Sequence, residues 1–90
     1  MRLRTTDNFD QRLKNILRKN KSLGIEIQDV VQQLLNGESN DGLRLHQLEG
    51  DLSLFWSISI NDDLRILFYS QNDTIVLSDI GTHKEVYGEH

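Results

Sequence analysis

Residues 64–80, LRILFYSQNDTIVLSDI, decide the fold of this chain. They contain two apolar runs, Leu64–Tyr69 and Thr74–Ile80, whose β-branched and aromatic side chains favour strands. The polar residues Gln71-Asn72-Asp73 between the runs predict a turn, and strands joined by a short turn pair antiparallel. Because both runs are apolar on both faces, we expect other elements to cover the sheet.

Outward from this hairpin, the upstream sequence predicts further strands. Phe55–Ile60 is predicted to form the next strand, with Trp56, Ile58 and Ile60 on one face. Asn61-Asp62-Asp63 is predicted to form the turn that follows it. Leu43–His46 alternates as a half-buried strand does, which puts His46 on the face opposite the two leucines. The short alternating segment Arg2–Thr5 is a further strand candidate. The consecutive strands from residue 43 onward, which are joined by short turns, predict an antiparallel meander.

The N-terminal part of the chain has helical periodicity. After a capping segment at 6–8, apolar residues recur at the spacing of one helix face, at Phe9, Leu13, Ile16 and Leu17. A second helix is predicted from the apolar face Ile27, Val30, Val31, Leu34 and Leu35. Gly37 is the expected left-handed residue at its end. Two helices so close in sequence form an antiparallel hairpin, so the fold class is α+β, with the helix hairpin packed on an antiparallel sheet.

Composition predicts a globular protein with one domain over residues 1–90. Hydrophobic residues make up 37% of the chain and charged residues 27%, which are ordinary values for a soluble domain. No apolar run approaches the roughly 20 residues of a membrane span, and no secretory signal follows the N-terminus. We therefore expect a cytoplasmic protein with no membrane partner. The absence of cysteine excludes disulfides and cysteine-based metal sites.

Charge is distributed unevenly along the chain. Residues 1–22 carry seven basic and two acidic side chains, a net charge of +5. Residues 23–90 carry three basic and twelve acidic side chains, a net charge of −9. A local basic patch can meet phosphate even on an acidic protein. The alternative, that these residues form only the solvated face of a helix, stays open.

Three residues are candidates for chemistry: His46, Arg65 and His83. Arg65 interrupts an apolar strand, and a charge there must be paired or must face a cleft. A structural ion pair with Asp63, Asp79 or another acid is the alternative for Arg65, and an inert surface position is the alternative for each histidine. No glycine-rich phosphate loop, His-Glu-x-x-His motif or nucleophile elbow is present. The three histidines lack metal-ligand spacing with acids, so we expect no metal and no cofactor.

Four segments match a known pattern in the same order along the chain. They are Thr5 leading to Phe9 and a basic helix, Leu45–Gly50 (LHQLEG), Trp56–Ile58 with Asp63–Phe68 (WSI and DLRILF), and Asp79–Tyr87 (DIGTHKEVY). This pattern resembles the RelE/YafQ toxins of the RelE/ParE superfamily, and the C-terminal segment is its most specific part. The resemblance implies two N-terminal helices on an antiparallel sheet of about four or five strands. It also implies the toxin of a type II toxin–antitoxin system, with a cognate antitoxin as partner.

The activity that the resemblance implies is cleavage of mRNA on the ribosome, by acid–base catalysis without a metal. Such cleavage needs a base for the 2′-OH, positive charge at the phosphate and an acid for the departing 5′-oxygen. His46 and His83 resemble the family's catalytic histidines, Arg65 would hold the phosphate, and Asp63 would orient a histidine or act as a base. Tyr87 matches an aromatic position suited to stacking on a base. The residues expected to bind RNA are basic: Arg12, Lys14, Arg18, Lys19, Lys21, Arg44 and Lys84.

Two departures from the family pattern bear on this activity. Ser59 stands where YafQ-like toxins carry a further histidine. Residues 23–90, with their net charge of −9, repel RNA, so binding would rely on the basic first helix and on contacts with the ribosome. Two alternatives therefore stay open: a ParE-like inhibitor of DNA gyrase, and a catalytically weak homologue that acts as an antitoxin-binding co-repressor module. The histidine pair favours the nuclease, and the acidic charge favours the co-repressor.

Overall fold

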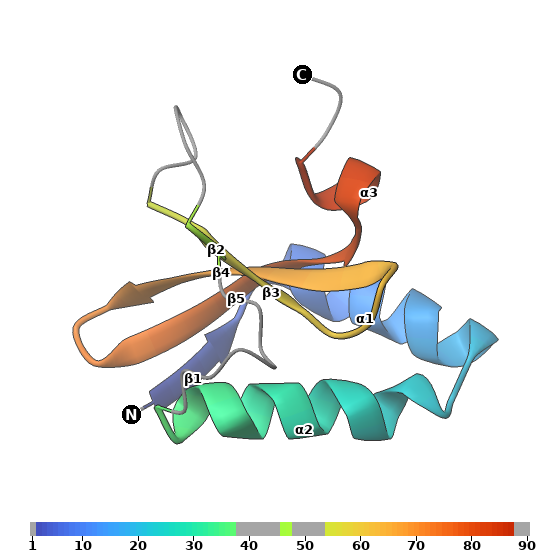
Figure 1. Ribbon diagram of the computed structural model, residues 1–90, viewed down its shortest axis with the longest axis horizontal. Coiled ribbons are helices and arrows are strands. Elements are labelled where there is room, and N and C mark those ends of the chain that lie inside the picture. Colours follow the sequence, from blue (N-terminus) through green and yellow to red (C-terminus); the bar gives the residue numbers. More distant parts are fainter. Residues whose placement is uncertain (1, 38–45, 48–53, 88–90) are drawn as a thin grey trace.

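The computed structural model describes residues 2–37, 46–47 and 54–87, with the backbone alone at positions 46, 47, 83 and 87. The elements follow the order β1 (Arg2–Thr5), α1 (Asp7–Lys19), α2 (Leu23–Leu35), β2 (His46–Gln47), β3 (Trp56–Ser59), β4 (Leu64–Gln71), β5 (Thr74–Thr82) and α3 (His83–Tyr87). Helices α2 and α3 lie on opposite sides of the sheet (Figure 1). The α+β class and the two N-terminal helices are thus confirmed. Of the expected strand Leu43–His46, residues 43–45 lie outside the described part of the chain.

The five strands form one sheet in the order β1-β5-β4-β3-β2. Strands β2 to β5 pair antiparallel, as expected, but β1 pairs parallel to β5, with Leu3 opposite Ile75. The sheet is therefore mixed at one edge. The connection between these two strands contains almost the whole chain, so no local turn fixes their relative direction.

The β4–β5 hairpin confirms the predicted turn and contains an irregularity that matters for the site. Asn72 and Asp73 have φ angles of 50° and 63°, as a tight hairpin turn requires of residues that tolerate the left-handed region. Further along, Leu67 pairs with Asp79 whereas Phe68 pairs with Leu77, so one residue of β5 bulges out. This shift lets Ile75, Leu77 and Ile80 all lie in the core cluster, whereas Asp79 stands beside Leu67 on the opposite face.

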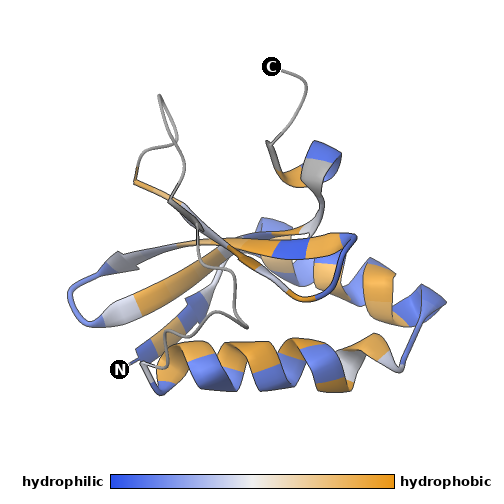
Figure 2. Ribbon diagram, in the orientation of Figure 1, coloured by the Kyte–Doolittle hydropathy of each residue, from blue (hydrophilic) through white to orange (hydrophobic). Residues whose placement is uncertain are grey.

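The core lies between the sheet and the two long helices. At its centre, Ile58, Ile66 and Ile80 stand opposite one another on β3, β4 and β5, and none has any exposed surface. Burial of one such side chain stabilises the fold by about 1.5–3 kcal/mol. Phe9 of α1 and Leu34 of α2 are buried in the same cluster. Figure 2 shows the apolar residues of α2 turned toward the sheet, which confirms the predicted helix faces.

The first helix is fixed to β5 by its own N-cap. Thr6 Oγ1 accepts a hydrogen bond from the Phe9 N–H (3.1 Å) and donates one to the Ser78 carbonyl (2.8 Å). The same threonine therefore begins α1 and attaches it to the last strand. At the end of α2, Gly37 has a φ of +74°, the left-handed conformation predicted for it.

Candidate functional site

The strand register puts several candidate residues on the sheet face that α2 does not cover. His46 stands opposite Ser57, which stands opposite Leu67 on β4. In the next row, Ser59 and Gly81 stand on either side of Arg65. Directly opposed residues share a face, and so do residues two apart on one strand, so positions 46 and 65 lie on the same face. Standard strand spacings separate their Cα atoms by about 12 Å.

Arg65 is held in the middle strand of this face. Its side chain is half-buried, its Nε is buried, and it interacts with other groups of the protein. Ser59 is half-buried directly across from it. Asp79, one of the acids considered as a partner for Arg65, forms an ion pair with Arg12.

Asp63 and His83 leave the sheet at the same end. Asp63 is exposed in the β3–β4 turn, where Asn61 Oδ1 accepts hydrogen bonds from the N–H groups of Asp63 and Leu64, both at 2.8 Å. Leu64 pairs with Thr82, so position 83 follows β5 just where position 63 precedes β4. The backbone thus brings these two candidates to neighbouring strand ends.

Helix α3 carries two candidate residues at its ends and is fixed by a capping box. The Glu85 N–H donates to Thr82 Oγ1 (3.2 Å), and Glu85 Oε1 accepts from the Thr82 N–H (2.9 Å). Val86 is buried, and the helix packs on β5 and β4. Positions 83 and 87 are one helical turn apart and share a face. Sequence reasoning missed this helix, although Thr82-x-x-Glu85 is a recognised capping signal.

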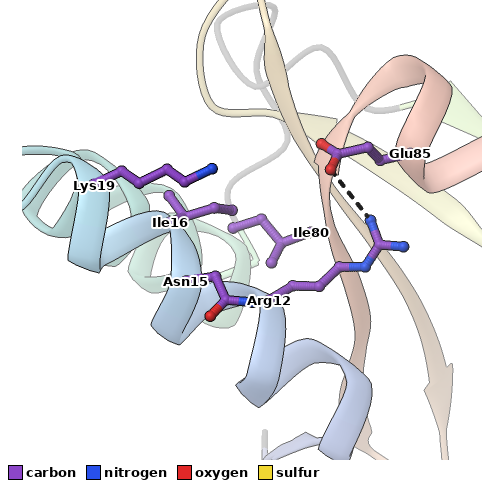
Figure 3. A pocket seen from close by; sticks show the side chains of 6 residues that line it. All are labelled: Arg12, Asn15, Ile16, Lys19, Ile80 and Glu85. Atoms are coloured by element: carbon purple, nitrogen blue, oxygen red, sulfur yellow. Dashed lines mark ion pairs between the residues drawn. The ribbon is translucent and has the colours of Figure 1, made fainter.

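Arg12 belongs to an ion-pair group, beside a cavity of about 240 Å³ between α1 and α3. Its Nε lies 3.1 Å from Asp79 Oδ1, and its Nη1 lies 3.8 Å from Glu85 Oε2. Figure 3 shows the guanidinium pointing at Glu85, with Lys19 on the same side of the helix. The pKa of Glu85 is lowered from its ordinary value, chiefly by the hydrogen bond from the Thr82 N–H, with Arg12 and Lys19 contributing. Sequence reasoning missed this role of Arg12, because both partners come from the other end of the chain.

The remaining basic residues expected to bind RNA are spread over different places. Lys14 and Arg18 are exposed one turn apart on α1, on the side away from the core, and Lys21 is exposed in the turn after that helix. Lys84 is exposed on α3 and interacts with other groups of the protein. Arg44 lies outside the described residues. The structure therefore separates Arg12 and Lys19, beside the cavity, from the outward side chains of Lys14 and Arg18.

This arrangement can be set beside known proteins. Residues 1–88 match the family model for YafQ, described as a bacterial toxin of a type II toxin–antitoxin system. The chain belongs to the YafQ toxin family. No curated protein sequence matches it closely enough to extend this assignment.

Solved structures agree with the fold of a YafQ toxin. A metal-bound toxin from Helicobacter pylori has a TM-score of 0.84 at 24% identity, over 96% of this chain and 98% of that one. The DinJ–YafQ complex from E. coli has a TM-score of 0.84 at 14% identity, over 98% of this chain and 100% of that one. A YoeB/ParE toxin from Agrobacterium tumefaciens has a TM-score of 0.80 at 16% identity, over 92% and 99%. At these identities the likeness establishes the shared fold.

Within residues 2–37, 46–47 and 54–87, no group of three or more His, Asp or Glu side chains is arranged to hold a metal ion. The side chains of His46 and His83 are not among those described. Among the residues that are described, no helix is long and apolar enough to cross a membrane.

Proposed function

We propose that this YafQ-family toxin is an endoribonuclease that cleaves mRNA on the ribosome. The observation that carries the proposal is the shared sheet face of His46 and Arg65, with His83 and Tyr87 on the short helix that follows β5. Two imidazoles and a guanidinium are the groups that cleavage through the 2′-OH requires. Cytoplasmic location follows from this substrate.

In the proposed mechanism, one histidine removes the proton from a 2′-OH. The 2′-oxygen then attacks the adjacent phosphorus, and the bond to the departing 5′-oxygen breaks. The other histidine protonates that oxygen, which leaves a 2′,3′-cyclic phosphate and a 5′-OH end. Arg65 stabilises the additional negative charge on the phosphate oxygens, and its planar guanidinium suits that task. Asp63 orients a histidine or acts as a base, and Tyr87 stacks on a neighbouring base.

Substrate binding relies mainly on the basic side chains of residues 1–22, outside the acidic residues 23–90. Lys14, Arg18 and Lys21 are exposed on or just after α1, in the segment with a net charge of +5. Each phosphate contact made by such a side chain makes RNA binding weaker as salt increases. Arg44 and Lys84, which stand two residues before His46 and one residue after His83 in the sequence, are proposed to add further phosphate contacts.

A cognate antitoxin is the proposed protein partner. The family description names a type II toxin–antitoxin system, and a YafQ from E. coli has been solved in complex with DinJ. An antitoxin binds by laying an amphipathic or extended segment over the surface of its toxin.

The test is cleavage of mRNA by the purified chain on ribosomes that are translating it. Wild type should cut within the translated region, whereas His83→Ala should lose about 10²–10⁴-fold in rate because one of the two proton transfers loses its group. His90→Ala is the matched control, since this histidine lies beyond residues 1–88 that match the family model. It should cleave at the wild-type rate. Full activity of His83→Ala, with its fold intact by circular dichroism, would show that the acid–base role for this residue is wrong.

A further inference from the structure

Helix α3 cannot hold its position without help from other elements. An isolated helix of five residues is unstable in water, so the orientation of His83–Tyr87 is set by what the helix touches. Burial of Val86 against the sheet supplies one contact, and the Thr82–Glu85 capping box fixes the first turn. The second carboxylate oxygen of Glu85 then faces Arg12 of α1 (Figure 3).

Arg12 joins three elements through one planar group. Its Nε meets Asp79 of β5 at 3.1 Å, and its Nη1 meets Glu85 of α3 at 3.8 Å. Asp79 is only 9% exposed, and its Oδ1 also accepts the Ile80 N–H at 2.8 Å, so that end of the arrangement is rigid. The guanidinium is planar and rigid, so the ion pair of Nε with Asp79 also fixes the position of Nη1. Nη1 is the positively charged group that faces Glu85.

The backbone at Gly81 permits this close approach. A Cβ at that position would lie 3.0 Å from Glu85 Oε1 and 3.3 Å from Arg12 Nη1, closer than ordinary van der Waals contact. Gly81 has no side chain, so Arg12 and Glu85 can approach each other beside β5.

We propose that Arg12, Asp79 and Glu85 form an ionic clamp that orients α3, and that Arg12 is a positioning residue rather than an RNA contact. The inference rests on the proposed function, because the helix that the clamp orients carries His83 and Tyr87. The short α3 is fixed at its first turn, between these two positions. Arg12 reaches the substrate only through the helix that it holds.

The first arm of the test reads the clamp without any activity. Arg12→Gln should accelerate amide hydrogen exchange of Thr82 and Glu85 about two- to fivefold, while exchange at Ile66 in the core stays as in wild type. Glu85→Gln, which keeps an acceptor for the Thr82 N–H and leaves Asp79 paired, should also accelerate exchange at position 82. Arg2→Gln, which removes an exposed arginine from β1, is the matched control and should change neither rate. Unchanged exchange in both clamp variants would overturn the proposal.

The second arm reads cleavage on translating ribosomes. If the clamp orients α3, Arg12→Gln lowers kcat about 10- to 100-fold and leaves KM and the salt dependence of RNA binding as in wild type. If Arg12 instead contacts phosphate, KM rises and the slope of log K against log salt falls by about one, which would overturn the positioning role. Absence of cleavage by wild type would contradict the proposed function alone, and the exchange measurements would still decide the clamp.

Discussion

Substitution of Gly81 by alanine provides a quantitative test of the packing between β5 and α3. The new Cβ would lie 3.0 Å from Glu85 Oε1, 3.1 Å from Glu85 Cβ and 3.3 Å from Arg12 Nη1. Overpacking of this kind costs about 1–3 kcal/mol. Replacement of glycine by alanine also restricts the unfolded chain, which stabilises the protein by about 0.4–1 kcal/mol. We therefore expect a net loss of about 0.5–2 kcal/mol in the free energy of unfolding.

The matched control is the same substitution at Gly24 in the first turn of α2. There the Cβ would meet only Leu17 Cδ2, at an ordinary 3.4 Å, so no overpacking opposes the gain. Gly24→Ala should stabilise the protein by up to about 1 kcal/mol. Urea unfolding followed by circular dichroism measures both variants, and thermal midpoints should move about 4–8 °C per kcal/mol. If Gly81→Ala is as stable as wild type while Gly24→Ala is stabilised, the argument from close contact is refuted.

Three further predictions follow from single residues. Thr6→Ala should lose about 1–2 kcal/mol of stability in urea, because it removes the N-cap hydrogen bond and the bond to the Ser78 carbonyl. Ser22→Ala removes no helix cap and only an exposed hydrogen bond to Asn20 Oδ1, so it should change stability by less than about 0.5 kcal/mol; equal losses would contradict this. The pKa of Glu85 is lowered, chiefly by the hydrogen bond from the Thr82 N–H, so the stability that its carboxylate contributes is present above pH 4.5 and is lost as the pH falls through the lowered pKa. An NMR titration midpoint at or above pH 4.5 would contradict this. Ser59→His should raise the cleavage rate by up to about 10²-fold, because the imidazole would face Arg65 across β3 and β4; an unchanged rate would argue against a role for this position.

Periodicity and turn chemistry predicted most of the fold because both depend on local sequence. The stripe beginning at Phe9 became the buried face of α1, and Asn72 and Asp73 adopted the left-handed angles that a tight hairpin needs. The capping box at Thr82 was equally local and was open to prediction.

Long-range pairing could not be predicted from the sequence, for a different physical reason. The parallel contact of β1 with β5 and the ion pair of Arg12 with Asp79 join residues from the two ends of the chain, and no short-range rule selects them. Charge patterning put Arg12 in a basic stripe, but only the folded chain gives it two acidic neighbours. The roles of His46, Asp63, Arg65, His83 and Tyr87 stay predictions. The sheet register puts positions 46 and 65 on one face and positions 63 and 83 at neighbouring strand ends.

The measurement that tests the nuclease most directly is induced expression of this chain alone, with the 5′ ends of cellular mRNA mapped before and after induction. The account predicts growth arrest with new in-frame 5′ ends inside translated regions, lost when translation is blocked and lost again in His83→Ala. Growth arrest with intact mRNA would contradict it and point to gyrase or another target. No arrest at all would contradict it in favour of a silent antitoxin-binding module.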